Sequence, residues 1–446
     1  MSGLVNRAIL AKKHAYITMD TLVIQGRAKL KGRISCLGSK NASLALLAAS
    51  VLFDKKIILH NLPRIGDVET MIKILASLGS RYQWLEEHSL ELDNSSLKPD
   101  QLDFSLVKKI RPSLVLMGPL AARFGTIKIS TPGGCNIGSR PIDAHLQALR
   151  ELGFSIQTEA DHYVVKRGDK WPSQIVMSEF SVTGTENVIL AAAGLDADLQ
   201  IKIAAADHPV QELCFFLQAA GLKIAGIGSH SLIIQGGQLQ GLEYTIMPDP
   251  IEAGTFLALA GATNSPLRID NLPLDFLTIE LQKFREAGVS FEIIEQRPGP
   301  GGNYQLADVQ VSKSAGLKAI SKLHDMPYPG FLPDLLQPFA VLLTQAQGVS
   351  LIYDWMYDGR LKYVQELTKM GADLKVLDPH RLMIAGPTPL YGKDMISYDI
   401  RAGASLVIAA LIADGQSLIK EANQIDRGYE KLAERLATLG ADIKRV

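Results

Sequence analysis

The same arrangement of hydrophobic and polar positions recurs six times along the chain. In each case apolar residues follow a helical period, a glycine ends the helix, and an alternating strand begins directly afterwards. A glycine in that place is typical of the left-handed turn that closes many helices. Successive glycines are 67 to 83 residues apart, which indicates a repeating unit: Gly79, Gly153, Gly221, Gly288, Gly371 and Gly440.

A second helical pattern, rich in alanine, precedes each of these segments and runs into a turn and a strand. Examples are NASLALLAAS, which starts at Asn41, and RAGASLVIAALIA, which starts at Arg401. The unit is therefore helix, strand, helix and hairpin. Because small residues let helices pack closely, we expect the alanine-rich helices inside, with sheets around them. The predicted fold class is α/β, a two-domain inside-out α/β barrel of six units, three per domain.

The sixth unit lacks a final strand, because the chain stops at GADIKRV. The segment DTLVIQGRAKLKGRISCLG near the N-terminus has the spacing of strands and glycines that closes other units, so we expect it to complete the sixth. This predicts an N-terminal extension followed by one discontinuous and one continuous domain, with the ranges 1–19, 20–39 plus 248–446, and 40–247. The chain would then cross twice between domains, an arrangement suited to hinge closure over a cleft.

Composition excludes several classes of protein. The 446 residues are 47% hydrophobic and 21% charged, and 46 basic residues balance 46 acidic ones, so no global field would hold nucleic acid or an anionic membrane. No apolar run reaches the roughly 18 residues of a membrane helix, and the first residues lack a secretion signal. Three cysteines without a close pair argue against a disulfide framework or zinc site. We expect a cytoplasmic protein.

Basic residues stand where several helices are predicted to start. A helix N-terminus offers unpaired N–H groups and partial positive charge to an anion, so such a set fits a polyanionic ligand between the domains. The alternative is that each cation is solvated or paired with a nearby carboxylate. First helices are expected to start with Lys40 and Asn41, with Arg111 and with Arg401, second helices with Arg140 and Arg427, and Arg360 occupies the corresponding region of the fifth unit.

Cys135 lies in the segment TPGGCNIGSRP, behind a Gly-Gly pair and five residues before an arginine. Such a loop could stabilise a thiolate and leave backbone N–H groups free for a phosphate. Free cysteines are more often buried and inert, so this pattern alone leaves both interpretations open. Core packing is the better interpretation for Cys36 and Cys214.

Four carboxylates stand beside turns or predicted helix starts: Asp67, Asp249, Glu252 and Asp334. For each one alone, an N-cap is the expected role. Asp334 differs because YPGFLPD places it after a rigid Pro-Gly-Pro segment at the start of the fifth unit's helix. There it would face the same cleft as the cations.

Motifs along nearly all of residues 20–446 resemble those of the enolpyruvyl transferases. In order they are GSKNASL, GDVETM, GPLAARFGTIKISTPGGCNIGSRPIDAH, TGTENVILAAA, PDPIEAGTF, YPGFLPD, DIRAGASLV and IDRGYEKL. The resemblance implies transfer of enolpyruvate from phosphoenolpyruvate to the 3-hydroxyl of UDP-N-acetylglucosamine, with loss of phosphate, as the first committed step of peptidoglycan precursor synthesis. It calls for no metal or other cofactor, and implies a target for fosfomycin.

The resemblance also implies roles for particular residues. Cys135 would give a proton to the phosphoenolpyruvate methylene, and Asp334 would contact the reacting hydroxyl as candidate base. A trianionic substrate needs a cationic cage, its carbon needs an acid, and the hydroxyl needs a base. Catalytic residues would be Cys135, Asp334, Lys40 and Arg427; substrate-binding residues would be Asn41, Arg111, Arg140, Pro141, Ile142, Asp143, Ala144, His145, Ser181, Val182, Met356, Arg360 and Arg401.

The chain departs from the family's usual pattern at several positions that flank the sugar nucleotide. Pro333 replaces a common threonine before the cleft aspartate, and YDGR stands where FENR is usual, so that Gly359 replaces asparagine. Glu179 and Thr183 replace a basic residue and a glycine, and His208-Pro209 replaces Pro-Glu. Two alternatives therefore stay open: a different nucleotide or sugar acceptor, or a UDP-sugar-binding paralogue without turnover.

Overall fold

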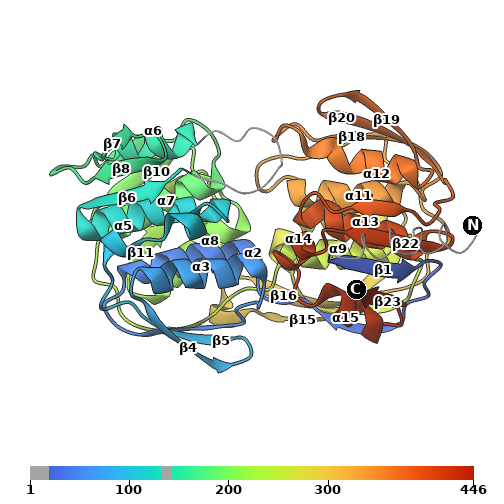
Figure 1. Ribbon diagram of the computed structural model, residues 1–446, viewed down its shortest axis with the longest axis horizontal. Coiled ribbons are helices and arrows are strands. Elements are labelled where there is room, and N and C mark those ends of the chain that lie inside the picture. The colour runs from blue at the N-terminus through green and yellow to red at the C-terminus, as the bar shows by residue number, and fades with distance from the viewer. Residues whose placement is uncertain (1–19, 132–141) are drawn as a thin grey trace, which may run out of the picture.

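The computed structural model describes residues 20–131 and 142–446. The described chain forms two lobes, each around its own hydrophobic core (Figure 1). One core runs from Ala42 to Met247 and adds three side chains from later in the sequence, and we call its part of the molecule the continuous lobe. The other core contains residues near both chain ends, from Leu22 to Ile443, and defines the terminal lobe. The exact domain boundaries given above stay a prediction.

Each lobe contains three units of the predicted kind. In the continuous lobe they are α2 (Lys40–Ala49), β3 (Ile57–His60), α3 (Gly66–Ser77), β4 (Arg81–Glu86) and β5 (Ser89–Asp93); the 3-10 helix η3 (Arg111–Leu116) with α5 (Met117–Phe124), β6 (Thr126–Ser130), α6 (Asp143–Glu151), β7 (Ser155–Thr158) and β8 (His162–Lys166); and α7 (Val182–Leu195), β10 (Leu199–Lys202), α8 (His208–Ala219), β11 (Lys223–Ala225) and β12 (Ser231–Gln235).

The terminal lobe repeats the pattern. Its units are α9 (Pro250–Ala262), β14 (Leu267–Pro273), α10 (Thr278–Glu286), β15 (Phe291–Pro298) and β16 (Gln305–Val311); α11 (Leu336–Leu343), β18 (Gly348–Tyr353), α12 (Tyr363–Lys369), β19 (Asp373–Asp378) and β20 (Arg381–Gly386); and α13 (Ile400–Ile412), β22 (Gln416–Lys420), α14 (Asn423–Asp426), α15 (Leu432–Thr438), β23 (Ile443–Arg445) and β1 (Thr21–Gln25).

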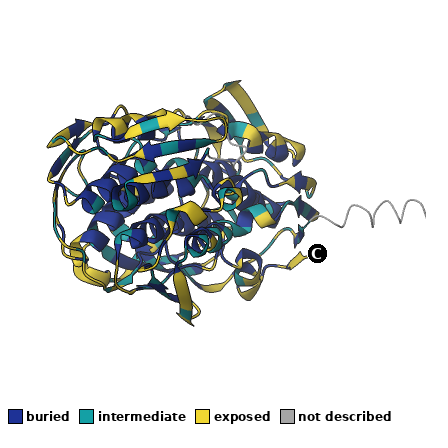
Figure 2. Ribbon diagram, turned by 60° about the vertical axis from the view of Figure 1, so that its left-hand side comes forward, coloured by how far each residue is buried: buried dark blue, intermediate teal, exposed yellow. Residues whose placement is uncertain are grey.

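The alanine-rich first helices lie inside, as predicted. In the terminal lobe α9, α11 and α13 pack against one another, and α9 and α13 are buried over nearly their whole length. Their small residues permit this contact: a methyl group added at Gly254 of α9 would come within 2.4 Å of the Leu335 side chain. Figure 2 shows buried helices in the interior and strands with exposed residues outside. The inside-out α/β arrangement is therefore confirmed.

The six repeat glycines all adopt positive φ angles, between +84° and +113°. L-residues with a side chain avoid this region, so glycine is the residue that can end the second helix and start the hairpin there. The turn that was predicted from spacing alone is thus present in every unit.

Neighbouring units in each lobe are joined because a strand that follows one unit's hairpin pairs with the sheet of another unit. Every sheet contains the first strand and the hairpin of its own unit, and five of the six add a parallel edge strand that follows another unit's hairpin. The sheet of the second unit, β6-β8-β7, has no donated strand. There the 3-10 helix η2 (Pro99–Gln101) and α4 (Phe104–Val107) pack against β6 instead. The donated strands are β9 (Gln174–Val176), β13 (Glu243–Thr245), β17 (Leu323–His324), β21 (Asp394–Ile396) and β2 (Gly32–Ser35).

The N-terminal segment completes the sixth unit, but only with its first strand. β1 lies between β22 and β23 and pairs antiparallel with both. The second strand, β2, was expected in the same unit and instead pairs parallel with β14 of the fourth unit. It therefore has the role of a donated edge strand, which closes the ring of three units.

The two segments that connect the lobes lie side by side. The Ser39 N–H donates to the Met247 oxygen at 2.8 Å, and the Asp249 N–H donates to the Leu37 oxygen at 2.8 Å. Gly38 takes part in this short antiparallel bridge and packs so closely that an added Cβ would lie 1.8 Å from the Asn61 oxygen. Both crossings are thus fixed to each other rather than independent.

Substitution of Gly38 tests how strictly this crossing is packed. We expect Gly38→Ala to lower the free energy of unfolding by about 1–3 kcal/mol, because the backbone of Asn61 must move to admit the methyl group. Chemical denaturation measures the change. Gly316→Ala is the matched control, since no atom lies within 4 Å of its Cβ position. Equal denaturation midpoints for the two variants would contradict the prediction.

Candidate active site

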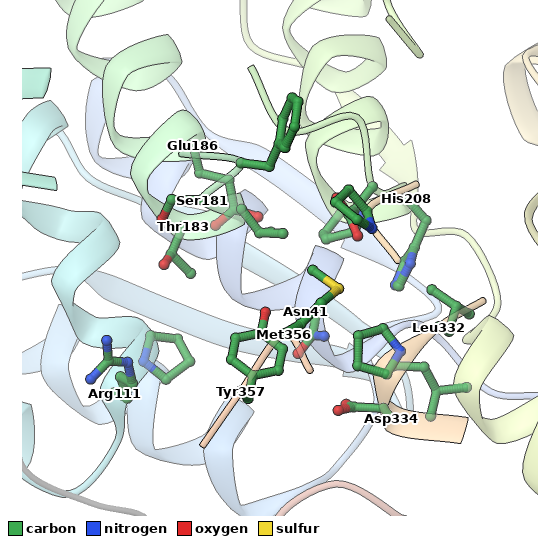
Figure 3. Close-up of a pocket in the computed structure, with 18 of the residues that line it drawn as sticks. Asn41, Arg111, Ser181, Thr183, Glu186, His208, Leu332, Asp334, Met356 and Tyr357 are labelled. Atoms are coloured by element: carbon green, nitrogen blue, oxygen red, sulfur yellow. The ribbon is translucent and has the colours of Figure 1, made fainter. Parts of the chain in front are cut away.

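A cavity of about 790 Å³ opens between the lobes and is lined by residues of both (Figure 3). Most predicted site residues that the structure describes lie on its wall: Lys40, Asn41, Arg111, His145, Ser181, Val182, Asp334, Met356, Arg360, Arg401 and Arg427. Ile142, Asp143 and Ala144 do not line it. Cys135, Arg140 and Pro141 lie outside the described residues.

Asp67 holds two of the cations together across the lobes. Its carboxylate lies 3.2 Å from Lys40 Nζ and accepts a hydrogen bond from Arg427 Nε at 2.9 Å. Asp67 is 1% exposed, so these charges meet in a poorly hydrated place, where they attract one another strongly. Arg427 comes from the terminal lobe, and the pair therefore connects the two walls of the cavity.

Asp334 holds a second pair of cations. Its two oxygens accept hydrogen bonds from Arg360 Nη2 and Arg401 Nε, each at 3.0 Å. Both arginines are nearly buried, while about a third of the Asp334 side chain is exposed. Asp334 therefore reaches the cavity while both arginines hold its two oxygens in place.

Arg401 also presents an unused donor. Its Nη1 is buried and has no hydrogen-bond partner among the described residues, although Nε contacts Asp334. An unpaired guanidinium N–H in a buried wall is costly unless a ligand satisfies it. The backbone nearby is fixed, because Asp399 caps α13 and accepts the N–H groups of Arg401 and Ala402 at 2.9 Å. The backbone that carries the Arg401 side chain is therefore held in place.

The loop that carries Met356 is positioned by a buried carboxylate. Asp325 is 0% exposed and accepts the backbone N–H groups of Trp355 and Met356 at 3.0 and 3.4 Å. Gly359, further along the same loop, has φ +72°. Glycine and asparagine both tolerate this region, so the departure from the family pattern at this position preserves the backbone turn.

A hydrogen-bond network deep in the continuous lobe fixes His145. The Asn187 oxygen accepts from the Gly118 N–H at 2.8 Å, which leaves its NH₂ group to donate to His145 Nδ1 at 3.0 Å. His145 Nε2 then carries the proton and donates to Thr183 Oγ1 at 2.9 Å. Burial and the charge of Arg111 lower the pKa of His145 to about 4, so the ring is neutral near pH 7.

A buried acid, Glu186, and a partly exposed one, Asp207, lie at another part of the wall. Burial is the main cause that raises the pKa of Asp207 to about 6, and burial together with the charge of Asp207 raises the pKa of Glu186. Both groups line the cavity, as does the exposed Glu179. Part of the cavity is therefore less cationic than the region around Asp67 and Asp334.

Four predictions about local structure are wrong, and one of them concerns Glu252, which lies inside the first turn of α9 and not at its cap. Arg427 was expected to open a helix and instead follows α14 as its C-cap. Asp334 was weighed as an N-cap, but neither η6 (Pro333–Leu335) nor α11 has a side-chain cap, so its carboxylate serves the arginines. Asp67 likewise lies inside the first turn of α3 and not at its cap. Arg111 does open a helix, but a 3-10 one.

Other expectations about side chains agree with the structure. Asp249 caps α9 and accepts the Ile251 N–H at 2.8 Å, as an N-cap should. Cys36 and Cys214 are 3% and 0% exposed, and burial raises the pKa of the Cys214 thiol to about 12. Both thiols therefore belong to the cores and not to the cavity.

Sequence analysis assigned no site role to Asp67 or Asn187, and it named His208 only as a departure from the family pattern. A helix cap was the nearest signal for Asp67, and nothing local distinguishes Asn187 from other residues of an apolar helix. Their roles depend on partners far away in the chain, such as Arg427 for Asp67. The structure is what brings these pairs together.

The geometry defines a two-lobed α/β protein with a cationic cavity that also holds a carboxylate, and comparison with known proteins gives the class. The sequence matches the family described as EPSP synthase (3-phosphoshikimate 1-carboxyvinyltransferase) over residues 24–436. The chain belongs to this family of enolpyruvyl transferases.

Relatives with full-length similarity share one name. UDP-N-acetylglucosamine 1-carboxyvinyltransferase of Campylobacter hominis is 38% identical over 430 residues, which cover 96% of this chain and 99% of the relative. The protein of that name from Bradyrhizobium diazoefficiens is also 38% identical, over 95% of this chain and 97% of the relative.

Solved structures share the fold. The enolpyruvyl transferase NikO from Streptomyces tendae matches with a TM-score of 0.85 and 22% identity, covering 96% of this chain and 99% of that chain. An EPSP synthase from Acinetobacter baumannii matches with a TM-score of 0.72 and 16% identity, covering 96% and 100%. Among the described helices, none is long and apolar enough to cross a membrane.

The pKa of His145 predicts how stability depends on pH. An unfolded chain takes up the proton near pH 6.5, whereas the folded protein resists it until about pH 4. The contribution of His145 is therefore complete above pH 6.5 and is lost as pH falls toward 4, by about 3 kcal/mol. His145→Gln should flatten the fall in unfolding free energy across this window, measured by urea denaturation. Parallel curves for the variant and the wild type would contradict a buried neutral imidazole.

Proposed function

We propose that the protein transfers the enolpyruvyl group of phosphoenolpyruvate to the 3-hydroxyl of UDP-N-acetylglucosamine and releases phosphate, a reaction that supplies peptidoglycan precursors. The observation that carries the proposal is the near-complete match, at 38% identity, to relatives named for this activity. The cavity supports it, because cations suited to phosphate and carboxylate groups surround a carboxylate suited to a hydroxyl. The substrates are small molecules, and we place the reaction in the cytoplasm.

The cations around Asp67 are suited to phosphoenolpyruvate. Lys40 and Arg427 share one carboxylate, so their net charge is positive and a trianionic substrate would be attracted to them. Arg401 would add its unused Nη1 donor, and Asn41 an amide at the start of α2. As phosphate leaves, these groups would stabilise the charge that develops on its oxygens.

Asp334 is the candidate base. In the proposed reaction the acceptor hydroxyl loses its proton to Asp334, its oxygen bonds to C2 of phosphoenolpyruvate, and the methylene carbon C3 gains a proton. Cys135 is the proposed donor of that proton. Loss of phosphate from C2 and of a proton from C3 then restores the double bond, so atoms and electrons balance.

The nucleotide sugar is proposed to lie along the continuous lobe. Arg111, His145, Ser181 and Val182 line that side of the cavity. The Ser181 side chain caps α7 by accepting the Gly184 N–H at 3.2 Å, so its backbone and that of Val182 are held at a helix start. Arg140, Pro141, Ile142, Asp143 and Ala144 are proposed to join this site, and Met356 and Arg360 to face it from the terminal lobe.

Acceptor choice is the part that needs a direct test. We expect the purified protein to release phosphate from phosphoenolpyruvate with UDP-N-acetylglucosamine and far less with UDP-glucose, other nucleotide sugars or shikimate 3-phosphate. A phosphate assay with this panel measures the ratio. Preference for another member of the panel would assign a different acceptor, and binding of UDP-N-acetylglucosamine without phosphate release would identify a non-catalytic paralogue.

Asp334→Asn separates the role of base from the role of binding. Asparagine keeps the shape but cannot accept the proton, so turnover should fall by about 10²-fold or more while calorimetric binding of UDP-N-acetylglucosamine changes much less. Asp103→Asn is a control outside the cavity, since this carboxylate caps α4 by accepting the Ser105 N–H, a role that asparagine can also fill. An Asp334→Asn enzyme with wild-type turnover would exclude Asp334 as the base.

A further inference from the structure

His208 lines the cavity with both ring nitrogens unused. It is the first residue of α8 and is 3% exposed. Neither Nδ1 nor Nε2 has a hydrogen-bond partner among the described residues. A buried imidazole without partners is destabilising, so native proteins rarely keep one unless something else satisfies it. Because His208 lines the cavity, a ligand in the cavity can supply the missing hydrogen-bond partner.

The surroundings place His208 at the end of the cavity where the chemistry is proposed. Figure 3 shows His208 and Asp334 toward one side of the view and Arg111 toward the other. The charges of Asp249, Arg401 and Asp334 all act on its pKa, which also places it near them. Phe276 packs against the ring at 6.3 Å between centroids in a T-shaped contact and offers no hydrogen-bonding atom.

The protonation state limits what His208 can bind. Burial is the main cause that lowers the pKa of His208 to about 4, so the ring is neutral near pH 7. A neutral imidazole has one donor and one acceptor, which matches an uncharged group that can also do both, such as a hydroxyl or an amide. Phosphate and carboxylate groups are only acceptors at this pH, and the arginines already suit them.

We propose that His208 is a specificity-determining residue that hydrogen-bonds an uncharged hydroxyl or acetamido group of the acceptor sugar near its reacting end. This rests on the proposed function and adds a contact to it. His208 is also one of the positions where this chain departs from the usual pattern of its family, so the contact would be particular to this chain.

The test compares an apolar ring with a polar replacement. His208→Phe keeps a flat ring but loses both hydrogen bonds, whereas His208→Gln keeps a donor and an acceptor. We expect His208→Phe to raise the KM for UDP-N-acetylglucosamine about tenfold, with the KM for phosphoenolpyruvate and the calorimetric affinity for UDP unchanged. His208→Gln should recover most of the loss. His60→Phe, a half-exposed histidine away from the cavity, is the matched control.

Thermal unfolding of the ligand-free protein gives an independent reading. Because His208→Phe removes unsatisfied polar atoms, its Tm should equal or exceed that of the wild type. If the phenyl ring is too large for the site and His208→Phe does not fold, the same KM measurements are made with His208→Leu. UDP-glucose, which lacks the acetamido group, shows which group His208 contacts. If His208 contacts the acetamido group, His208→Phe leaves the KM for UDP-glucose unchanged. If it contacts a hydroxyl, His208→Phe raises the KM for both UDP-glucose and UDP-N-acetylglucosamine.

Three results would overturn the inference. They are an unchanged KM for UDP-N-acetylglucosamine in His208→Phe, an equal loss of affinity for UDP, and a KM that His208→Gln does not recover. In each case turnover by the wild type shows that the proposed function itself stands. A wild-type protein that neither binds nor turns over UDP-N-acetylglucosamine would remove the proposed function and this inference together.

Discussion

Burial of the small-residue helices in the centre of each lobe is the constraint on which the rest of the molecule depends. Once these helices lie inside, the sheets must lie outside, and the first turns of several helices reach the space between the lobes. Those turns carry Lys40, Ser181 and Arg401. The charged cavity is thus a consequence of how the apolar residues are packed.

The charges in that cavity are kept in balance by carboxylates. Asp67 and Asp334 each contact two cations, so the basic residues do not repel one another freely in the absence of substrate. Each carboxylate is contacted by residues distant in sequence, and Asp67 joins residues of both lobes. The cationic side chains are therefore already oriented before an anion binds. This reduces the loss of side-chain entropy on binding.

The periodicity of the sequence was sufficient to predict the repeated unit. It was insufficient to predict which strands and side chains of different units contact one another. Gly79 and its five counterparts have the predicted turn because a positive φ angle has a local cause. The sheet that receives β2 could not be predicted, since a strand pattern contains no information about its neighbour. Likewise, the contact between Asp67 and Arg427 joins residues 360 positions apart, and the short helix α14 that precedes Arg427 leaves no clear period.

The position of β1 has a consequence for how the protein is made. This strand lies between β22 and β23, which begin only at Gln416 and Ile443 and are therefore synthesised much later than β1. The sheet of the sixth unit can therefore form only after residues 416–445 have been synthesised. Until then Leu22 and Ile24, both buried in the finished protein, have no partners and must stay in solution or be protected by a chaperone. The continuous lobe meets no such delay, because all its strands are made in one uninterrupted stretch.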